Sequence, residues 1–205
     1  GSEMCIRDSL YSMDGTETNI SDYVKLAKKY NALTYLDEVH AVGLYGKGGR
    51  GVAYKNNVSD QIDIINGTLA KGFGQIGGYI VADQTTIDFI RSFAPGFIFT
   101  TSMMPSIAAA ASKSIEIVEN LDEERADIFN KARYLRQKLN LLDIPYIDSN
   151  SHIIPILTYS TKKAKLFSKL LLQQYNGYIQ PIFYPTVPEG SARLRITVTP
   201  KHSIQ

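Results

Sequence analysis

Lys71 is the side chain of this sequence whose neighbours most suggest chemistry, because it lies in residues 67–74 (GTLAKGFG), a run of small residues. Glycines let the backbone approach a flat ligand closely, and a lysine in a partly desolvated pocket has its pKa lowered toward that of a nucleophilic amine. Thr68 could donate a hydrogen bond to a phosphate. The phosphate-loop pattern G-x-x-x-x-G-K-[ST] is not met, because Gly72 follows the lysine. A plain glycine-rich turn stays open as the other interpretation.

A carboxylate and a histidine follow a short apolar segment in residues 37–43 (DEVHAVG). Ligands of open α/β sheets bind at the carboxyl ends of strands, which is where Asp37 is expected to lie. Asp37 could pair with a protonated heterocycle nitrogen or bind a metal, and His40 could contact the same ligand. An aspartate that caps a helix, followed by a structural histidine, explains the pattern equally well.

Asp37 and Lys71 together indicate pyridoxal phosphate (PLP) chemistry. PLP enzymes use a lysine for a Schiff base and an acidic partner for the pyridinium nitrogen. The two residues supply both groups at the expected ends of neighbouring strands. We therefore predict PLP as the cofactor, and we predict no metal site.

Two arginines alternate along the segment Arg193-Leu194-Arg195. On a strand they share one face, while Leu194 points to the other. Arginine can hold a carboxylate through two parallel hydrogen bonds, so one of the pair is a candidate for binding a substrate carboxylate. For Arg193 we favour a plain surface charge.

Short apolar segments alternate with amphipathic ones as far as residue 142, which predicts an α/β domain, and the later segments predict a smaller α+β domain. In the first part we predict strands at residues 33–37, 62–68 and 78–82 and helices at 23–30, 85–92, 105–121 and 123–142. In the second part we predict strands at residues 153–157, 178–180 and 194–198 and a helix at 162–175.

The first residues show neither helical nor strand periodicity. We expect residues 1–8 to be a non-native scar outside the fold, with Cys5 included, and organised sequence to begin near Ser9. The predicted domains are residues 9–142 and 143–205, and both ends of the chain are expected to be truncated.

The composition is that of an ordinary globular protein, with 44% hydrophobic and 20% charged residues. A net charge of +2 and the absence of a basic run argue against a nucleic-acid partner, and no apolar stretch reaches the ~18 residues that cross a membrane. The single cysteine cannot form an internal disulfide, which favours a reducing compartment. We expect the cytoplasm for a bacterial protein and the mitochondrial matrix for a eukaryotic one.

From about Ser9 to Ser203 the chain resembles the α-oxoamine synthases, fold-type I PLP enzymes that join an amino acid to an acyl-CoA with loss of CO2. The similar segments are residues 11–15 (YSMDG), 37–46 (DEVHAVGLYG), 67–74, 89–102 (FIRSFAPGFIFTTS), 151–155 (SHIIP), 180–188 (QPIFYPTVP) and 193–197 (RLRIT). The resemblance implies the C-terminal half of a fold-type I large domain followed by a smaller α+β domain.

The resemblance implies cofactor roles for four residues of the segments 37–43 and 67–74. Lys71 would hold PLP as a Schiff base and later move the α-proton of the amino acid. Asp37 would keep the pyridine nitrogen protonated, and His40 would contact the phenolic oxygen of the ring. Thr68 would bind the phosphate.

Other residues would bind the substrates or the neighbouring subunit. Thr100 and Thr101 would reach the PLP phosphate of the second subunit, which implies a homodimer with shared active sites. Arg195 would hold the carboxylate of glycine, and Thr186 would contact the succinyl carboxylate. These segments are most similar to the family member that condenses glycine with succinyl-CoA, which acts in haem biosynthesis.

Sister synthases remain the alternative, namely 8-amino-7-oxononanoate synthase and 2-amino-3-ketobutyrate CoA ligase, because they share Lys71, Asp37 and His40. A catalytically silent subunit is a further alternative, but such subunits tend to lose the lysine. One departure concerns Glu189, where the members that condense glycine with succinyl-CoA usually carry an arginine on a loop thought to close over the site. A second is the missing N-terminal part, so we expect the isolated 205-residue chain to be inactive.

Overall fold

The computed structural model describes residues 4–204, and the chain divides into two compact units. The first unit comprises the residues up to Leu10 together with Thr18–Asp122, and the second comprises Tyr11–Glu17 and Glu123–Gln205. The division falls at the start of helix α6 (Asp122–Leu141), whereas the sequence suggested a boundary near residue 142. Hydrogen bonds from α6 explain the difference, since Lys131 Nζ donates to the carbonyl of Pro200 (2.6 Å) in the second unit.

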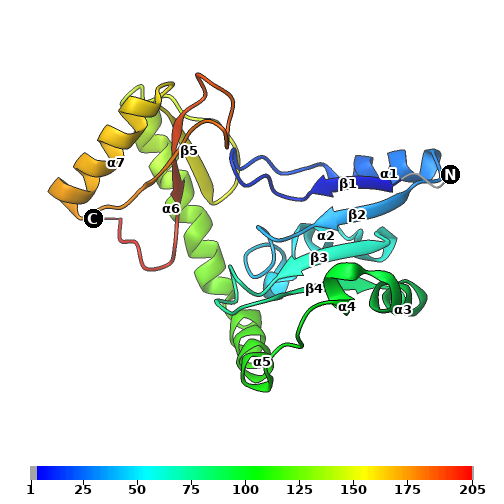
Figure 1. The fold of residues 1–205 in the computed structure, drawn as a ribbon. Helices are drawn as coiled ribbons and strands as arrows, with labels where there is room; N and C mark the ends of the chain where they lie inside the picture. Colours follow the sequence, from blue (N-terminus) through cyan, green and yellow to red (C-terminus); the bar gives the residue numbers. More distant parts are fainter. Residues whose placement is uncertain (1–3, 205) are drawn as a thin grey trace. The chain divides into compact units, whose positions relative to one another are not determined.

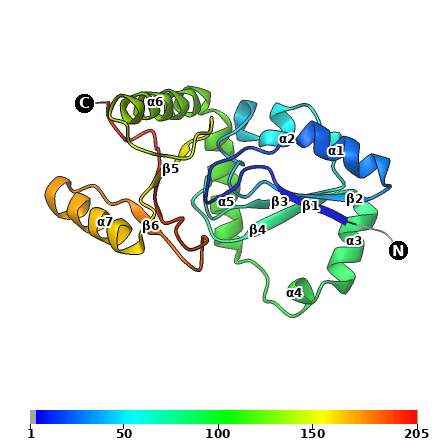
Figure 2. The same cartoon turned by 90° about the horizontal axis from the view of Figure 1, so that it is seen from above.

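A four-stranded sheet in the order β1-β2-β3-β4 forms the centre of the first unit (Figures 1 and 2). Strands β1, β2 and β3 are parallel, and β4 runs antiparallel to β3. Parallel strands present their carboxyl ends at the same edge, so the residues that follow β2 and β3 are brought together there. The strands are β1 (Met4–Asp8), β2 (Leu33–Asp37), β3 (Ile64–Thr68) and β4 (Gly78–Ala82).

The expectation that residues 1–8 lie outside the fold is wrong for Met4–Asp8. This segment is β1, and it pairs with β2 in a register that runs from Met4 opposite Leu33 to Asp8 opposite Asp37. Its Met4 and Ile6 side chains stay about half exposed, at 48% and 56%. This edge strand is held by backbone pairing rather than by side-chain burial. Its sequence therefore shows no alternation of apolar and polar residues.

Helices lie on both sides of this sheet. Figure 2 shows α1 and α2 on one side and α3 and α4 on the other. No helix among residues 4–204 is long and apolar enough to cross a membrane. The helices of the first unit are α1 (Ile20–Lys29), α2 (Val52–Lys55), α3 (Gln84–Phe93), α4 (Pro95–Ile98) and α5 (Pro105–Glu119), with 3-10 turns at Lys47–Gly49 and Ser59–Gln61.

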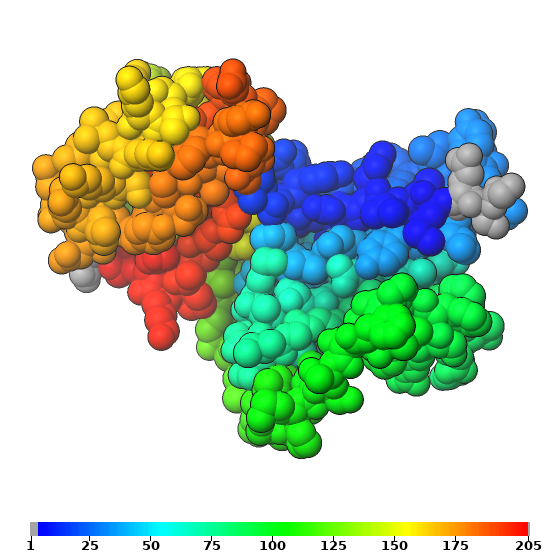
Figure 3. Space-filling view, viewed as in Figure 1, coloured from blue at the N-terminus to red at the C-terminus, as the bar shows by residue number. Residues whose placement is uncertain are grey.

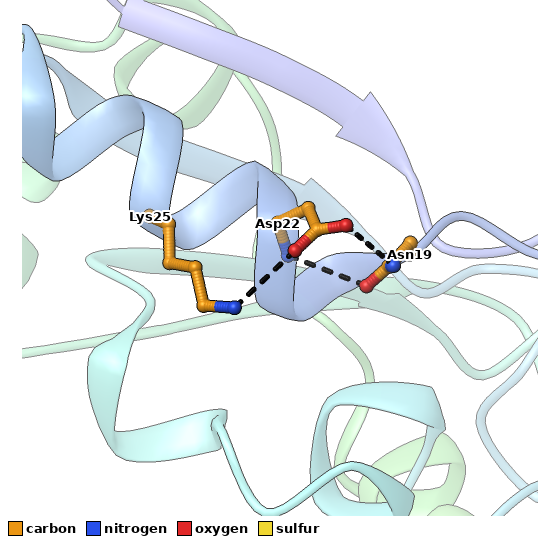
Figure 4. Close-up of polar contacts among 3 residues, drawn as sticks. All are labelled: Asn19, Asp22 and Lys25. Atoms are coloured by element: carbon orange, nitrogen blue, oxygen red, sulfur yellow. Dashed lines mark hydrogen bonds and ion pairs between the residues drawn. The ribbon is translucent and has the colours of Figure 1, made fainter.

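The start of α1 is capped by Asn19 (Figure 4). The Asn19 side-chain oxygen accepts from the backbone N–H of Asp22 (3.3 Å), and its amide nitrogen donates to the Asp22 carboxylate (2.7 Å). Lys25 adds an exposed ion pair to the same carboxylate (3.4 Å). These contacts satisfy a free N–H group of the first turn and place a negative charge at the positive end of the helix.

Tyr23 ties α1 to the two strands beneath it, and its replacement by phenylalanine tests that connection. The hydroxyl donates to the carbonyls of Cys5 (2.7 Å) and Tyr35 (3.3 Å), and burial raises the pKa of Tyr23 to about 12 from its ordinary 10.0. We expect Tyr23→Phe to lower the free energy of unfolding by about 1 kcal/mol at neutral pH.

The same substitution should alter the alkaline limb of the stability profile. The folded state holds the phenolic proton more tightly than the unfolded state, so this stabilisation is complete below pH ~10 and is lost as the pH rises through ~12. Urea unfolding at pH 7 and across the alkaline range measures both effects. A variant as stable as wild type at pH 7, with the same alkaline slope, would contradict this role of Tyr23.

The second unit is a three-stranded antiparallel sheet accompanied by two helices. The strand order is β5-β7-β6, and a small core forms around Ala164, Ala192 and Leu194. The strand predicted at residues 178–180 lies two residues further along, at Gln180–Ile182. The elements are α6 (Asp122–Leu141), β5 (Ile153–Leu157), α7 (Thr161–Tyr175), β6 (Gln180–Ile182) and β7 (Arg193–Thr197).

Candidate active site

Asp37 is the last residue of β2, and its half-buried carboxylate is held on both oxygens. Oδ1 accepts from the backbone N–H of Val39 (2.8 Å), and Oδ2 accepts from the side-chain amide of Asn66 (3.1 Å) on the neighbouring strand. Within residues 4–204 no lysine or arginine pairs with this carboxylate. Each oxygen has a second acceptor position, so Asp37 can still accept a proton donor such as a pyridinium N–H.

Asn66 is a site residue that the sequence reasoning missed. It lies opposite Asp37 in the β2–β3 register, and its side chain orients the carboxylate. The signal was present, because Asn66 is a polar residue inside an apolar strand.

Lys71 lies in the tight connection between β3 and β4. Hydrogen bonds across this loop close it on itself: Leu69 N–H donates to Gly77 (2.9 Å), and Gln75 N–H donates to Leu69 (2.7 Å). The Lys71 side chain is exposed and forms no ion pair with the described residues. The desolvated pocket expected around this lysine is therefore not supplied by residues 4–204, and its amine is free to react with a ligand.

Thr68 forms two side-chain hydrogen bonds within the same loop. Its hydroxyl donates to the carbonyl of Gly77 (3.2 Å) and accepts from the N–H of Ala70 (3.1 Å). The hydroxyl shapes the start of the Lys71 loop, and its predicted contact with a phosphate stays a prediction.

The loop that follows β2 packs directly on the Lys71 loop, so the structure brings the two predicted motifs together. A Cβ placed on Gly72 would lie 2.7 Å from the carbonyl oxygen of Val42 and 3.3 Å from Cα of Gly43. Only glycine allows this approach, which explains the residue after the lysine. His40 lies half-buried in the same loop. Asp37, His40 and Lys71 thus belong to two segments in contact at the carboxyl edge of the sheet.

Thr100 and Thr101 lie in the exposed connection between α4 and α5. They line a cavity of about 910 Å³ that also includes Gly77, the residue that accepts from Thr68. The surrounding segment is unusually apolar at its surface, with Phe97 at 55% and Phe99 at 86% exposure. Figure 3 shows this segment, coloured green, at the surface of the first unit. Such exposure is compatible with the predicted contact to a second subunit, which stays a prediction.

The second unit holds Arg195 with its guanidinium half-buried. Nη1 donates to the carbonyl of Ser12 (3.2 Å), and burial lowers the pKa of Arg195. Within residues 4–204 Arg195 has no carboxylate partner, so most of its donors remain available for a carboxylate ligand.

The interpretation of Arg193 as a surface charge is wrong, because this residue is only 7% exposed. Its Nε donates to the carbonyl of Ser191 (3.0 Å), and its Nη1 donates to the carbonyl of Met13 (3.1 Å). Arg193 and Arg195 thus hold the segment Tyr11–Glu17 from one face of β7. Gly15 completes the contact, since a Cβ there would lie 2.5 Å from Ser151 Oγ.

Thr186 and Glu189 lie in the exposed turn between β6 and β7 of the second unit. The Thr186 N–H donates to Phe183 (3.0 Å), and its predicted substrate contact is a side-chain role that stays a prediction. Glu189 lines a cavity of about 410 Å³ together with Tyr184.

Known proteins match this chain over nearly its whole length. The 5-aminolevulinate synthase of Rickettsia felis is 50% identical over 201 residues, which are 98% of this chain and 49% of that protein. The 5-aminolevulinate synthase of Bradyrhizobium diazoefficiens is 48% identical over 195 residues, which are 95% of this chain and 48% of that protein. The chain therefore spans about half the length of the curated relatives it matches, and these relatives confirm the resemblance found in the sequence.

Solved structures confirm the predicted fold class. The serine palmitoyltransferase of Sphingomonas wittichii superposes with a TM-score of 0.92 at 28% identity, over 99% of this chain and 51% of that one. The 8-amino-7-oxononanoate synthase of Francisella tularensis superposes with a TM-score of 0.85 at 24% identity, over 99% of this chain and 59% of that one, and supports the fold alone. The family model described as aminotransferase class I and II matches residues 2–205, so the chain belongs to the aminotransferase class I and II family and has the fold-type I architecture of its PLP-dependent members.

Proposed function

We propose that the whole protein condenses glycine with succinyl-CoA to give 5-aminolevulinate, CoA and CO2, with PLP as its cofactor. The observation that carries the proposal is the contact between the loop after β2 and the Lys71 loop, in a chain about half identical to 5-aminolevulinate synthases. This contact gathers an amine, a carboxylate and a histidine at the edge of the sheet where ligands bind in open α/β folds. Among residues 4–204 the amine forms no ion pair.

The residues present fit PLP. Asp37 has acceptor positions left for a protonated ring nitrogen. The close packing of Gly43 on Gly72 holds the loop of His40 beside the loop of Lys71. When bound, PLP withdraws electrons from the α-carbon of an attached amino acid. The Asp37 carboxylate favours the protonated ring nitrogen on which this withdrawal depends, because an opposite charge nearby stabilises the charged form.

The chain's own side chains would perform the remaining steps. Lys71 Nζ would hold the cofactor covalently and then, as a free amine, take a proton from the glycine α-carbon and return one after CO2 is lost. His40 would donate to the phenolic oxygen of the cofactor, and Thr68 would contact its phosphate. Arg195 would bind the glycine carboxylate through two parallel hydrogen bonds.

Three further assignments belong to this proposal. Thr186 would contact the succinyl carboxylate, and the exposed Thr100 and Thr101 would complete the site of a second subunit in a homodimer. Since this chain spans about half of its relatives, the activity is proposed for the whole protein.

A substrate comparison tests the function. We expect the whole protein to form an aminoketone from glycine and succinyl-CoA, and to react at least about tenfold more slowly with alanine and a pimeloyl thioester. A hybrid in which this chain replaces the matching part of the Rickettsia felis protein gives the same comparison in a full-length chain. Preference for alanine and the pimeloyl thioester would identify a sister synthase, and failure to bind PLP would reject the proposal altogether.

Gly72→Ala tests the contact that carries the proposal. The new methyl group must displace the Val42 carbonyl or the lysine loop, and overpacking of this kind costs about 1–3 kcal/mol. We expect the affinity of the whole protein for PLP to fall about tenfold or more, as measured by titration of the cofactor absorbance. Gly177→Ala is the control, because its Cβ would meet nothing closer than Leu171 O at 3.9 Å. Equal affinities in the two variants would contradict a role for this contact.

A further inference from the structure

Glu38 is a buried carboxylate that the proposed chemistry does not use. Its side chain is 1% exposed, and both of its oxygens accept hydrogen bonds. Oε2 accepts from Ser9 Oγ (2.8 Å) and from the N–H of Val52 (3.0 Å), and Oε1 accepts from the N–H of Ala53 (2.7 Å). Burial raises the pKa of Glu38, although these three donors oppose the shift. A buried acid this well supplied with donors has a fixed position.

The hydrogen bonds to this carboxylate join three segments of the first unit. Ser9 follows β1, Glu38 itself follows β2, and Val52 and Ala53 form the first turn of α2. The loop 39–51 therefore begins directly after Glu38 and ends directly before the two residues whose N–H groups bind the Glu38 carboxylate. The carboxylate closes both ends of this loop, and it accepts from the free N–H groups at the start of α2.

Two backbone features bind the loop further to Glu38. The carbonyl of Glu38 accepts from the N–H groups of Ala41 (2.8 Å) and Val42 (2.9 Å), and its own N–H donates to Asn66 (2.8 Å). Gly51 has a φ of +102°, and a Cβ there would lie 2.9 Å from the carboxylate. A side chain at position 51 would therefore clash with the Glu38 carboxylate, so glycine is needed there.

The loop closed in this way is the one that contacts the Lys71 loop. It carries His40, and its Val42–Gly43 backbone lies against Gly72. Asp37 precedes Glu38 directly, so any shift of Glu38 moves Asp37 as well. The contacts of one buried side chain therefore bear on where two predicted cofactor residues, Asp37 and His40, stand relative to the sheet.

We propose that Glu38 is a positioning residue, whose carboxylate fixes the loop 39–51 and thereby holds Asp37 and His40 in register with the Lys71 loop. The inference rests on the proposed function, because the held residues matter through the cofactor they would bind. An acceptor-only group is required at this position. A glutamine would direct an NH2 group at one of the three donors and leave that donor unsatisfied.

Glu38→Gln in the whole protein tests this role, with Asp63→Asn as the matched control. Asp63 also accepts two hydrogen bonds, from the N–H and the hydroxyl of Thr34 (2.7 Å each), but it does so at the opposite ends of β2 and β3. Both variants lose a carboxylate that bridges strands. Only Glu38→Gln should disturb the loop 39–51.

Three measurements separate positioning from general stability: hydrogen exchange of the amides of residues 39–51 without cofactor, the dissociation constant for PLP, and the circular dichroism of the bound cofactor. We expect Glu38→Gln to speed exchange in the loop, to weaken PLP binding about tenfold or more, and to change the cofactor dichroism. Asp63→Asn should lower the melting temperature and leave these three values as in wild type.

The outcomes distinguish this inference from the proposed function. Failure of the wild-type protein to bind PLP rejects the function, whereas the cofactor-free exchange measurement still tests the loop. Wild-type exchange and affinity in Glu38→Gln, or an equal loss of affinity in Asp63→Asn, would overturn the positioning role. If Glu38→Gln does not fold, Ser9→Ala removes one donor only, and it should show smaller changes in the same direction. Unchanged exchange and affinity in Ser9→Ala would overturn the role in that case.

Discussion

Lys71→Ala is expected to lower the turnover of the whole protein by about 1,000-fold or more, because it removes both the covalent attachment and the group that moves the proton. The lysine is exposed, its amine pairs with no carboxylate among residues 4–204, and its loop is closed by its own backbone hydrogen bonds. Removing the side chain should therefore leave the melting temperature within about 2 °C of wild type. Steady-state turnover and thermal unfolding measure the two quantities.

Lys47→Ala is the control for this result. Lys47 is also an exposed, glycine-flanked lysine of the first unit, and it lies in the 3-10 turn Lys47–Gly49. We expect it to keep wild-type turnover. An added primary amine should restore part of the activity of Lys71→Ala, since the missing group is an amine. Turnover within tenfold of wild type in Lys71→Ala would remove Lys71 from the chemistry.

Several strands could be predicted from the sequence because each is a short apolar run that ends at a polar residue. The bounds of Leu33–Asp37, Gly78–Ala82 and Ile153–Leu157 agree with the prediction. The helix predicted at residues 105–121 begins at its N1 proline and ends two residues earlier, at Glu119. Asp37 could be placed at a strand end for the same reason, since the polar residue follows an apolar run.

Other elements could not be predicted, because they depend on neighbours far away in the sequence. Strand β1 (Met4–Asp8) forms by pairing with β2, and its own side chains stay partly exposed. The four-residue helix α2 exists because the carboxylate of Glu38 accepts its first N–H groups. Arg193 looks like a surface charge until the segment Tyr11–Glu17 covers it.

In the candidate site, too, some features could be predicted from local sequence and others depend on distant residues. Residue types identified Lys71 and Asp37, whereas the contact of Gly72 with Val42 needed the pairing of β2 with β3. The burial expected around Lys71 was a prediction from its glycine neighbours, and residues 4–204 leave this lysine exposed. Glycines indicate a close approach of backbone to backbone as readily as an approach to a ligand.

Asp37→Asn should lower turnover by about 10- to 1,000-fold. A carboxylate beside a protonated ring nitrogen raises the pKa of that nitrogen by about 1–3 units, and each unit lost makes the protonated form about tenfold rarer. Asparagine has nearly the same shape, and it can still accept from the N–H of Val39 through its oxygen. What it loses is the negative charge and the contact with Asn66, since two NH2 groups would then face each other. Bound cofactor would lose its protonated ring nitrogen while Lys71 stays in place. Turnover should therefore fall much more than the affinity for PLP, and steady-state kinetics with cofactor titration measures the two separately.

Asp8→Asn is the matched control, because Asp8 ends the neighbouring strand and lies opposite Asp37 in the β1–β2 register. Burial raises the pKa of Asp8, and the charge of Asp37 raises it further, so the two carboxylates share one electrostatic environment. If only the summed negative charge at this edge of the sheet mattered, both variants would lose turnover to a similar extent. If the hydrogen-bonded carboxylate of Asp37 is the group that meets the ring nitrogen, only Asp37→Asn should be slow. Equal turnover in the two variants would therefore contradict the assignment of Asp37, and with it the PLP geometry proposed for this edge.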